Sequence, residues 1–329
     1  MKRAYGLVVV AAITALVGES PIQAQQKEPP RKFTNSIGMK FIWIPPGTFQ
    51  MGSPKDEGGR GNDETQHQVT LTKGFYLGVH LVTQDQWKAV MDCNYSKFKG
   101  DKSLPVERVN WEECQVFLQK MGKKDGHVYR LPTEAEWEFA CRAGSKAAYS
   151  YGADLNLLDQ YAWYDKNSED KTHPVGQKRP NGWGLYDMQG NVWQWCADWY
   201  GEYPQNAVVD PQGPFSDPSR ISENISEFIL QLSSPKFVER QAATKALKEI
   251  GWPTLPALRK VAINGPDLET QLRARQLMAA IPGNSEGRVL RGGAFYDQAS
   301  SVRAACRAYS LPGNYYYSFS LRVATNSAK

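Results

Sequence analysis

The sequence has few histidines and no paired cysteines. Its 5 cysteines include no Cys-x-x-Cys pair. Zinc sites need clustered sulfur and imidazole ligands, so none is expected. No Gly-x-Ser-x-Gly motif indicates the nucleophile turn of a serine hydrolase. The 4 histidines are isolated from one another along the chain: His67, His80, His127 and His173.

Blocks of like charge and long apolar runs are also missing. The 39 Lys and Arg residues are interspersed with 34 Asp and Glu residues, for a net charge of +5. This mixture does not predict a nucleic-acid partner. After residue 24, no apolar run approaches the roughly 18 residues of a membrane span. We therefore expect no membrane span in the mature chain.

The N-terminal 24 residues are typical of a signal peptide. Lys2 and Arg3 precede an apolar stretch from Leu7 to Val17, and a helix-breaking patch follows it. A short membrane anchor is the alternative. We predict cleavage after residue 24, a polar linker over 25–32, and export to the periplasm or the extracellular space. An odd number of cysteines there leaves at least one thiol free.

Two parts of the chain, 33–214 and 285–326, are rich in glycine, proline and aromatic residues. The chain contains 10 Trp and 16 Tyr. Short apolar runs between turn signals predict strands, among them Phe41–Ile44, Val69–Leu71 and Phe75–Leu77. Capping residues predict helices that begin near Thr83, Asn110 and Thr133. These two parts are expected to form one loop-rich α+β domain.

Residues 215–284 differ in composition, because glycine and aromatics become rare and Leu, Ala, Lys, Arg and Glu recur with helical period. The pattern resembles one to one-and-a-half HEAT-like units. Phe237, Val238 and Leu247 are predicted to point inward from one helix, and Leu268 and Leu272 from another. A lone unit of this kind cannot bury its apolar face, so we expect this all-α insert to dock on the main domain or on a partner protein.

Several motifs occur in one order along the chain, and together they resemble the formylglycine-generating-enzyme (sulfatase-modifying factor) family. The resemblance implies a loop-rich α+β domain related to C-type lectins, here interrupted by the HEAT-like insert. It covers the mature chain outside that insert. The motifs are Gly47–Gly52, Val82–Gln84, Arg130–Glu138, Asn181–Met188, Gly190–Trp193 and Arg288–Gly293.

The chain departs from that family at the residues that carry its chemistry. In the active relatives a serine follows the Gly-Gly pair, and two cysteines further on bind copper and activate oxygen. Here these positions hold Ala294, Asp297 and Val302. Copper(I) prefers sulfur ligands, so we do not expect copper. A shift of register that brings Cys306 into the site would disturb the match of Arg307 to the family pattern.

The resemblance also implies two structural features. Cys141 and Cys306 lie where relatives can have a disulfide, which we expect here. Asn191, Val192 and Gln194 lie in a segment that resembles a calcium loop of the family. Relatives usually have a glutamate at the position of Gln194, and the neutral amide attracts a hard cation less strongly. Calcium binding is left open.

Two functions remain open from the sequence. The first is an exported, non-catalytic protein that binds a protein, peptide or glycan in a groove. The second is a divergent formylglycine-generating oxidase that acts on a peptide or protein with a relocated site, for which Cys196 is a further candidate. An open cleft with converging Asp, Arg and Cys side chains would favour catalysis. The candidate groove residues are Asp297, Arg303, Arg307, Tyr315, Tyr316 and Tyr317.

Overall fold

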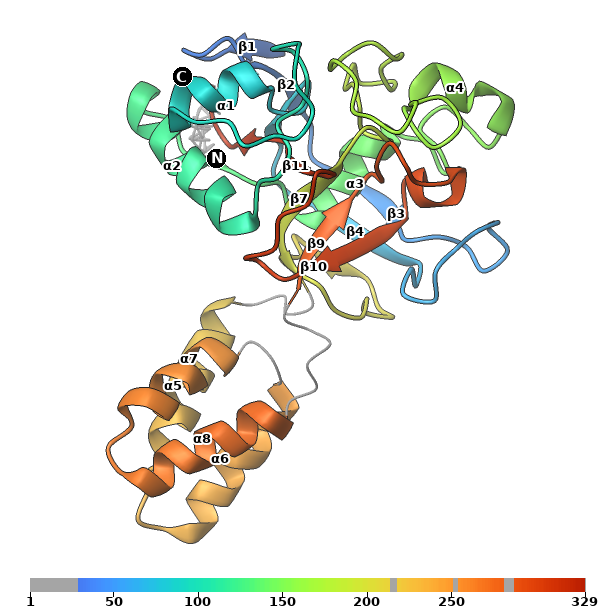
Figure 1. Cartoon of the computed structure of the whole chain (residues 1–329). Coiled ribbons are helices and arrows are strands. Elements are labelled where there is room, and N and C mark those ends of the chain that lie inside the picture. Colours follow the sequence, from blue (N-terminus) through green and yellow to red (C-terminus); the bar gives the residue numbers. More distant parts are fainter. Residues whose placement is uncertain (1–28, 214–217, 251–253, 281–286, 329) are drawn as a thin grey trace, which may run out of the picture.

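The computed structural model describes residues 29–213, 218–250, 254–280 and 287–328 (Figure 1). The predicted signal peptide, residues 1–24, lies outside these ranges, as do residues 25–28 of the predicted linker. The rest of that linker belongs to the fold. Tyr76 Oη donates to Pro30 O at 2.7 Å, and strand β1 begins at Lys32. The prediction of a linker up to residue 32 is therefore wrong at its C-terminal end.

Strands in the described part of the chain form three sheets. One is five-stranded, in the order β1 (Lys32–Thr34), β2 (Lys40–Ile44), β5 (Phe75–Gly78), β12 (Ala324–Thr325) and β6 (Tyr129–Arg130). The second has the order β10 (Arg307–Ser310), β9 (Arg288–Arg291), β7 (Trp193–Trp199) and β11 (Phe319–Leu321). The third has the order β3 (Gly47–Met51), β4 (His67–Leu71) and β8 (Val208–Val209).

The predicted strands at Val69–Leu71 and Phe75–Leu77 are confirmed, but they do not pair with each other. They lie in β4 and β5, which belong to different sheets. The C-terminal strand β12 pairs antiparallel with β5 and with β6. Segments from the two ends of the sequence therefore complete one sheet.

Each of the three predicted helix starts is confirmed. Helices α1 (Gln84–Met91), α2 (Trp111–Asp125) and α3 (Glu134–Arg142) begin after Thr83, Asn110 and Thr133 respectively. Each cap side chain accepts a hydrogen bond from the backbone N–H three residues on, and the side chain of that later residue accepts one from the backbone N–H of the cap. Two otherwise unpaired donors are thereby satisfied at each start. The short helices η1 (Leu155–Leu157), α4 (Leu158–Tyr161) and η4 (Ala299–Val302) lie in the loops.

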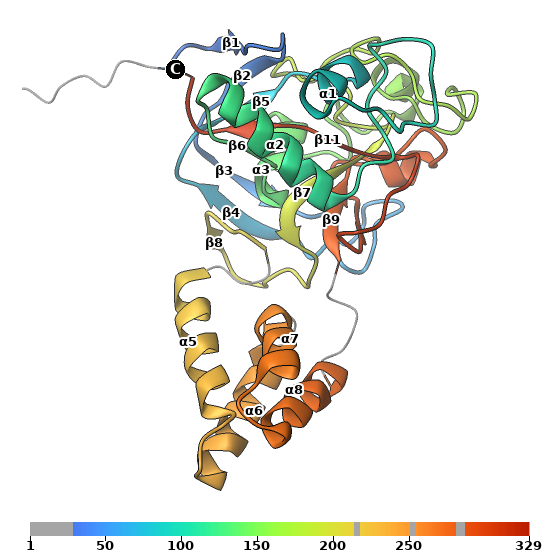
Figure 2. The same ribbon diagram turned by 60° about the vertical axis from the view of Figure 1, so that its left-hand side comes forward.

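The core lies on both faces of the five-stranded sheet. Alternate side chains of a strand point to opposite faces, so Phe41 joins one core cluster and Ile42 the other. The cluster of Phe41 includes Trp87 from α1 and Phe117 from α2. The cluster of Ile42 includes residues of α3. Figure 2 shows α1 and α2 across one side of the strands.

The helices of the 218–280 region lie apart from the sheets, below them in Figures 1 and 2. They are α5 (Pro218–Gln231), α6 (Phe237–Ile250), α7 (Leu255–Asn264) and α8 (Leu268–Ala280). Their core contains Leu232, Leu247, Leu258 and Leu277. Trp199, from the end of β7, packs against this cluster. The likeness of these helices to HEAT units stays a prediction.

The inward orientation predicted for several residues of these helices is wrong. Phe237 is 64% exposed, Val238 77%, Leu268 68% and Leu272 47%. Leu247 is fully buried as predicted, and Ala243, Ala274 and Leu277 lie with it in the core of these helices. An apolar surface therefore remains uncovered on this region.

The predicted disulfide is not formed in the structure. Cys141 and Cys306 are both free thiols. Cys141 is fully buried in the cluster of Ile42 and α3, whereas Cys306 lies at the edge of the cluster that contains Phe41. Their positions in two different core clusters explain the unpaired thiols.

No helix in the described ranges has the length and apolar character needed to cross a membrane.

Candidate functional site

The site begins with the two glycines that follow β9. Gly292 and Gly293 have φ angles of +99° and +73°, in the region that glycine tolerates best. A Cβ atom on Gly293 would lie 2.7 Å from Val302 Cγ1 and 2.8 Å from Ser301 O. Gly293 is therefore required by close packing against 301–302, whereas a Cβ atom on Gly292 would lie 3.0 Å from Met188 O.

A tight turn follows these glycines. The Ala294 N–H donates to Asp297 Oδ2 at 2.8 Å, and the Asp297 N–H donates to Ala294 O at 3.0 Å. Ala294 is fully buried and Asp297 is half-buried. The backbone N–H of Asp165 donates to Asp297 O at 3.0 Å, which brings a second acidic residue to the turn.

The carboxyl group of Asp297 has a raised pKa. Burial is the largest cause of the increase, because it disfavours the charged form. The Ala294 N–H and the Trp193 side chain act in the opposite direction, and the negative charge of Asp165 raises the pKa further. Asp297 therefore lies in an acidic, partly dehydrated setting.

The second position of the family's cysteine pair is filled by apolar packing. Val302 is fully buried in a cluster with Tyr149, Leu158, Ala162 and Tyr164. No thiol is available at this position, and the surrounding side chains leave it closed to solvent.

Three cysteines have thiols with raised pKa values. Burial raises the pKa of Cys306 to about 11 and that of Cys141 to about 12, and it raises that of Cys196 well above its usual range. These thiols are therefore protonated at neutral pH. Among the described residues, no group of three or more His, Cys, Asp and Glu side chains is arranged to hold a metal ion.

Arg303 does not face the candidate groove. It is buried, and its Nη1 atom lies 2.9 Å from Glu64 Oε2, while Nη2 lies 2.8 Å from Glu64 Oε1 and 2.7 Å from Gly59 O. Although burial acts against it, the hydrogen bonds from Arg303 and Ser53 keep the pKa of Glu64 below its usual value. Arg303 thus fixes the 57–64 loop, and its prediction as a groove residue is wrong.

Arg307 is also buried and paired within the protein. Its Nε and Nη2 atoms donate to the two carboxylate oxygens of Glu134 at 2.9 and 2.8 Å. Its guanidinium lies over the rings of Tyr203, at 3.8 Å, and Tyr200, at 4.4 Å. Its prediction as a groove residue is therefore wrong as well. For both arginines, carboxylates far away in the sequence decide the position.

The predicted tyrosines do form a surface. Tyr315, Tyr316 and Tyr317 are 58%, 52% and 39% exposed, and Tyr296 is 42% exposed. The ring centroids of Tyr296 and Tyr317 are 6.1 Å apart. The ring centroid of Phe295 lies 5.1 Å from that of Tyr296 and 6.0 Å from that of Tyr317. We call the four exposed tyrosines the tyrosine surface.

Neighbouring segments hold the tyrosine surface in place. The Arg108 N–H donates to Tyr316 O at 3.0 Å, and Tyr296 Oη lies 2.9 Å from Ser318 Oγ. The ring centroid of Phe98 lies 6.3 Å from that of Tyr317. Tyr296 contacts Tyr317 and is the residue before Asp297 in the chain. The structure thus brings Asp297 and the three predicted tyrosines into one region.

Sequence reasoning missed Tyr296, Phe98 and Asp165. Tyr296 had a signal in the sequence, because it lies between Ala294 and Asp297, the two family positions named in the sequence analysis. Phe98 and Asp165 carried no such signal, since only the three-dimensional fold brings them to this region.

The side chain of Gln194 is fully engaged within the protein. Its Oε1 atom accepts hydrogen bonds from Trp137 Nε1 at 3.0 Å and from Arg322 Nε at 2.9 Å, and its Nε2 atom donates to Asp187 O at 2.9 Å. The guanidinium beside Oε1 repels any further cation. This side chain therefore does not fit a calcium ion.

The other two predicted calcium residues are similarly placed. Asn191 Oδ1 accepts from the His173 N–H at 3.1 Å, and Asn191 Nδ2 donates to His173 O at 3.0 Å. The Val192 N–H donates to Gly190 O at 3.0 Å. These bonds hold the loop together.

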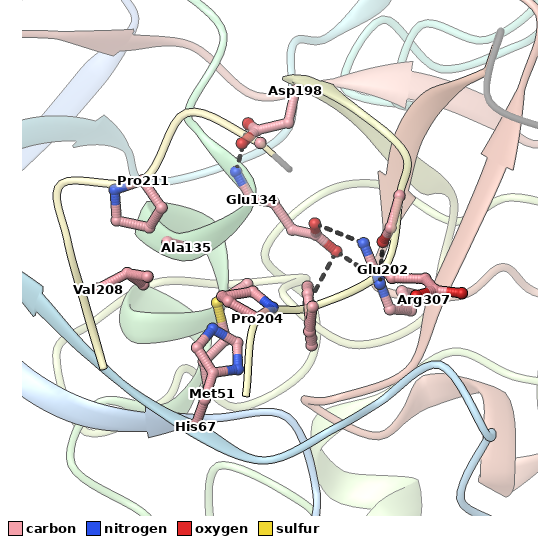
Figure 3. A pocket seen from close by; sticks show the side chains of 13 residues that line it. Met51, His67, Glu134, Ala135, Asp198, Glu202, Pro204, Val208, Pro211 and Arg307 are labelled. Atoms are coloured by element: carbon pink, nitrogen blue, oxygen red, sulfur yellow. Dashed lines mark hydrogen bonds and ion pairs between the residues drawn. The ribbon is translucent and has the colours of Figure 1, made fainter. Parts of the chain in front are cut away.

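A small cavity of about 70 Å³ lies elsewhere, between α3 and the loop that follows β7 (Figure 3). Glu134 lines this cavity together with Arg307 and Asp198, and its side chain lies between theirs in Figure 3. Tyr203 Oη also donates to Glu134 Oε1 at 2.9 Å. Since Arg307 and Tyr203 engage the Glu134 carboxylate, we assign this cavity a structural role.

Comparison with known proteins identifies the family. The family described as "Sulfatase-modifying factor enzyme 1-like domain" matches residues 25–327. The chain therefore belongs to the sulfatase-modifying factor family.

Curated relatives match only part of the chain. The chaperone protein LppX of Paenibacillus barcinonensis is 35% identical over 190 residues, which cover 42% of this chain and 67% of that protein. The formylglycine-generating enzyme of Streptomyces coelicolor is 36% identical over 140 residues, which cover 38% of this chain and 43% of the enzyme. The chain thus spans less than half the length of that enzyme.

Solved structures resemble nearly the whole chain. Treponema denticola variable protein 1 has a TM-score of 0.65 at 24% identity, covering 91% of this chain and 100% of its own. PvdO from Pseudomonas aeruginosa has a TM-score of 0.64 at 22% identity, covering 91% of this chain and 99% of its own. At these identities the likeness concerns the fold.

Proposed function

We propose that this member of the family is an exported, non-catalytic binding protein that recognises a peptide, protein or glycan at the tyrosine surface. The observation that carries the proposal is the state of the family's reactive segment. Val302 is enclosed by apolar side chains, and Asp297 is bonded to the Ala294 N–H. The segment therefore lacks the sulfur that copper-dependent oxidation of a thiol requires.

The tyrosine surface supports a binding role. Rigid aromatic side chains lose little conformational entropy on binding, and each offers both apolar area and a hydroxyl group. Four tyrosines that are each at least 39% exposed within one region offer a contact surface of this kind. The N-terminal signal-peptide pattern supports export.

The helices α5–α8 supply a second element of the proposal. Phe237, Val238, Leu268 and Leu272 are exposed on a region whose core is small. Uncovered apolar side chains in such numbers favour contact with another protein. We propose that this HEAT-like insert binds a partner protein, independently of the tyrosine surface.

The test is binding by a variant that carries Tyr315→Ala, Tyr316→Ala and Tyr317→Ala together. Peptide and glycan arrays first identify ligands of the wild-type protein. We expect the triple variant to bind them at least about tenfold more weakly, because exposed aromatic anchors dominate binding energies. The matched control is Tyr309→Ala, which removes a tyrosine of similar exposure, 49%, from β10. Circular dichroism checks that each variant is folded.

Equal affinity of the triple variant and the wild type would contradict a binding role for this surface. The catalytic alternative is examined in the same preparation with copper, oxygen and a cysteine-containing sulfatase-motif peptide. We expect no oxygen uptake and no loss of the peptide thiol by mass spectrometry. Copper-dependent turnover would overturn the non-catalytic proposal.

A further inference from the structure

A groove of about 620 Å³ is lined by the starts of two helices and of one strand. The first residue of α2, Trp111, the cap residue of α3, Thr133, and the first residue of β9, Arg288, all line it. None of the four residues of the tyrosine surface is part of its lining. We call it the Arg288 groove, because Arg288 is the residue there whose charge has the fewest partners.

Two tryptophan rings hold the guanidinium of Arg288. Its Cζ atom lies 3.9 Å from the ring centroid of Trp111 and 3.7 Å from that of Trp199. The ring of Trp111 is itself fixed, because its Nε1 atom donates to Cys196 O at 2.9 Å. A guanidinium held between two rings loses little conformational entropy when a ligand binds to it. Arg288 is therefore arranged in advance for a further partner.

The hydrogen-bonding capacity of Arg288 is largely unused. A guanidinium has five N–H donors. Here Nη1 donates to Ala197 O at 2.6 Å, while Nε is buried and no described residue accepts a hydrogen bond from it or from Nη2. The buried Arg322 differs, because its Nε, Nη1 and Nη2 atoms all donate to protein oxygens. The interior thus satisfies Arg322 but not Arg288.

The charge of Arg288 is also uncompensated. In the part of the chain that the structure describes, no carboxylate forms an ion pair with it, and burial lowers its pKa to about 10. The side chains of Arg303 and Arg307 have carboxylate partners, and their pKa values are raised. Burial raises the pKa of the nearby Asp198 to about 8, so this group is neutral at neutral pH and does not balance Arg288.

The other acidic groups of the Arg288 groove are already engaged. Glu136 pairs with Arg130 at 2.6 Å, and Asp210 Oδ1 accepts from the Thr72 N–H at 2.7 Å. Lys73 is an exposed lysine in the lining and adds a second positive charge. The groove therefore offers positive charge and free N–H donors, which an anion would satisfy.

We propose that the Arg288 groove binds a carboxylate group, carried by an acidic peptide side chain or by a small carboxylic acid, at the guanidinium of Arg288. A carboxylate is planar and matches the donor geometry of a guanidinium. The ionised Glu136 and Asp210 in the lining disfavour a doubly charged phosphate more than a singly charged carboxylate. This site shares no residue with the tyrosine surface and does not depend on the function proposed for it.

The experiment measures binding of end-capped nonapeptides to the full-length protein by fluorescence polarisation. Their central residue is glutamate or glutamine, and the flanking residues are uncharged. We expect the glutamate series to bind about tenfold more tightly than the glutamine series, and the difference to shrink in high salt because the attraction is screened. Succinate and inorganic phosphate are tested as competitors.

Variants connect this preference to the groove. Arg288→Met should abolish the preference for glutamate, and Arg288→Lys, which keeps the charge but not the planar donors, should weaken it several-fold. The exposed Lys73→Met should weaken it a few-fold, and it provides the test if the Arg288 variants do not fold. The matched control is Arg179→Met, which removes an exposed arginine outside the groove and should leave the preference unchanged. Circular dichroism checks the fold of each variant.

Several results would overturn the inference. They are an unchanged glutamate preference in folded Arg288→Met or, failing that variant, in Lys73→Met; stronger competition by phosphate than by succinate; and equal binding of the two peptide series together with no binding of succinate. Displacement of the peptides by succinate at similar concentrations would identify a small acid as the ligand, and displacement only by acidic peptides would identify a polypeptide. The triple tyrosine variant should retain the glutamate preference, so this inference and the proposed function fail separately.

Discussion

Asp198 is a buried carboxyl group near the end of β7. Its Oδ2 atom accepts a hydrogen bond from the Glu134 N–H at 2.7 Å. It borders both the cavity beside Glu134 and a larger groove of about 620 Å³ that Arg288 also lines. Burial raises its pKa to about 8, and the negative charge of Glu134 contributes to the increase. At neutral pH the folded protein therefore keeps this group protonated.

We predict that Asp198→Asn flattens the pH dependence of stability. The pKa of Asp198 is about 8 in the folded protein and near 4 in the unfolded chain. Between these values the folded state binds the extra proton, so the wild-type free energy of unfolding should fall as pH rises. The slope from this one group is at most about 1.4 kcal/mol per pH unit.

Urea denaturation at pH 5, 7 and 9 measures this effect. Asparagine retains an acceptor for the Glu134 N–H and cannot ionise. The variant should therefore gain stability over the wild type from pH 5 to pH 9, whereas Asp56→Asn should follow the wild type. Parallel curves for Asp198→Asn and the wild type would refute the prediction.

At the scale of single residues, the sequence predicted side chains near the surface better than buried ion pairs. Tyr315–Tyr317 form a run that can be recognised by eye. The positions of Arg303 and Arg307 depend on Glu64 and Glu134, which lie 239 and 173 residues away in the chain. No local pattern encodes such a pairing, so the groove predicted from these arginines was wrong.

Helix α3 links the sequence motif Arg130–Glu138 to the interior. Thr133 Oγ1 accepts from the Glu136 N–H at 3.1 Å, and Glu136 Oε2 accepts from the Thr133 N–H at 2.8 Å. Arg130 adds a two-pronged ion pair to Glu136, at 2.6 and 2.7 Å. The helix presents Glu134 to Arg307 and Glu138 to Arg291. The capped start of α3 therefore helps to fix the positions of the buried carboxylates of Glu134 and Glu138.

We predict that Thr133→Ala destabilises the protein by about 1 kcal/mol, since the loss of a helix cap typically costs this much. Thr133→Ser, which keeps the hydroxyl, should cost much less. Chemical denaturation of the two variants beside the wild type measures the difference. Equal stability of the alanine and serine variants would show that the cap hydrogen bond contributes little here.

At the scale of elements, helix starts were predictable and short strands were not. The capping signals at Thr83, Asn110 and Thr133 are local, and each marks a helix in the structure. Strands β6, β8 and β12 have two residues each. They exist because distant segments pair with them, and this pairing leaves no periodic pattern in the sequence.

Among the described residues, the segments on either side of the helical region both lie close to Trp199. A Cβ atom on Gly213, just before the region, would lie 3.5 Å from Trp199 O. Just after the region, Arg288 pairs with Trp199 across β9 and β7, and its guanidinium lies 3.7 Å from the Trp199 ring centroid. The segment before the region and the segment after it therefore both lie next to Trp199.

We predict that the α+β domain folds without this region. Replacing residues 215–284 by a short Gly-Ser linker should preserve the near-ultraviolet circular dichroism of the aromatic core, because the two attachment points are close. The midpoint of thermal unfolding should change by only a few degrees. An unfolded or aggregated product would mean that the helices stabilise the domain, and the proposal of an independent partner-binding element would then lose its basis.

At the scale of the whole molecule, the sequence predicted the family and the mixed helix and sheet architecture, because the motifs are distinctive in combination. The exposed faces of α6 and α8 were not predicted. A helical period identifies an apolar stripe, but it does not identify the neighbour that covers the stripe. Here Phe237 and Leu268 lie outside the helix contacts and remain exposed.

The position of β12 constrains when the protein can reach its final form. Residues 324–325 fill the gap between β5 and β6, in the interior of a sheet whose other strands come from residues 32–130. The ribosome makes the early strands long before the residue pair that joins them. Until residue 325 has been synthesised, the five-stranded sheet therefore lacks the strand that lies between β5 and β6. The chain can complete the folding of this sheet only after that point.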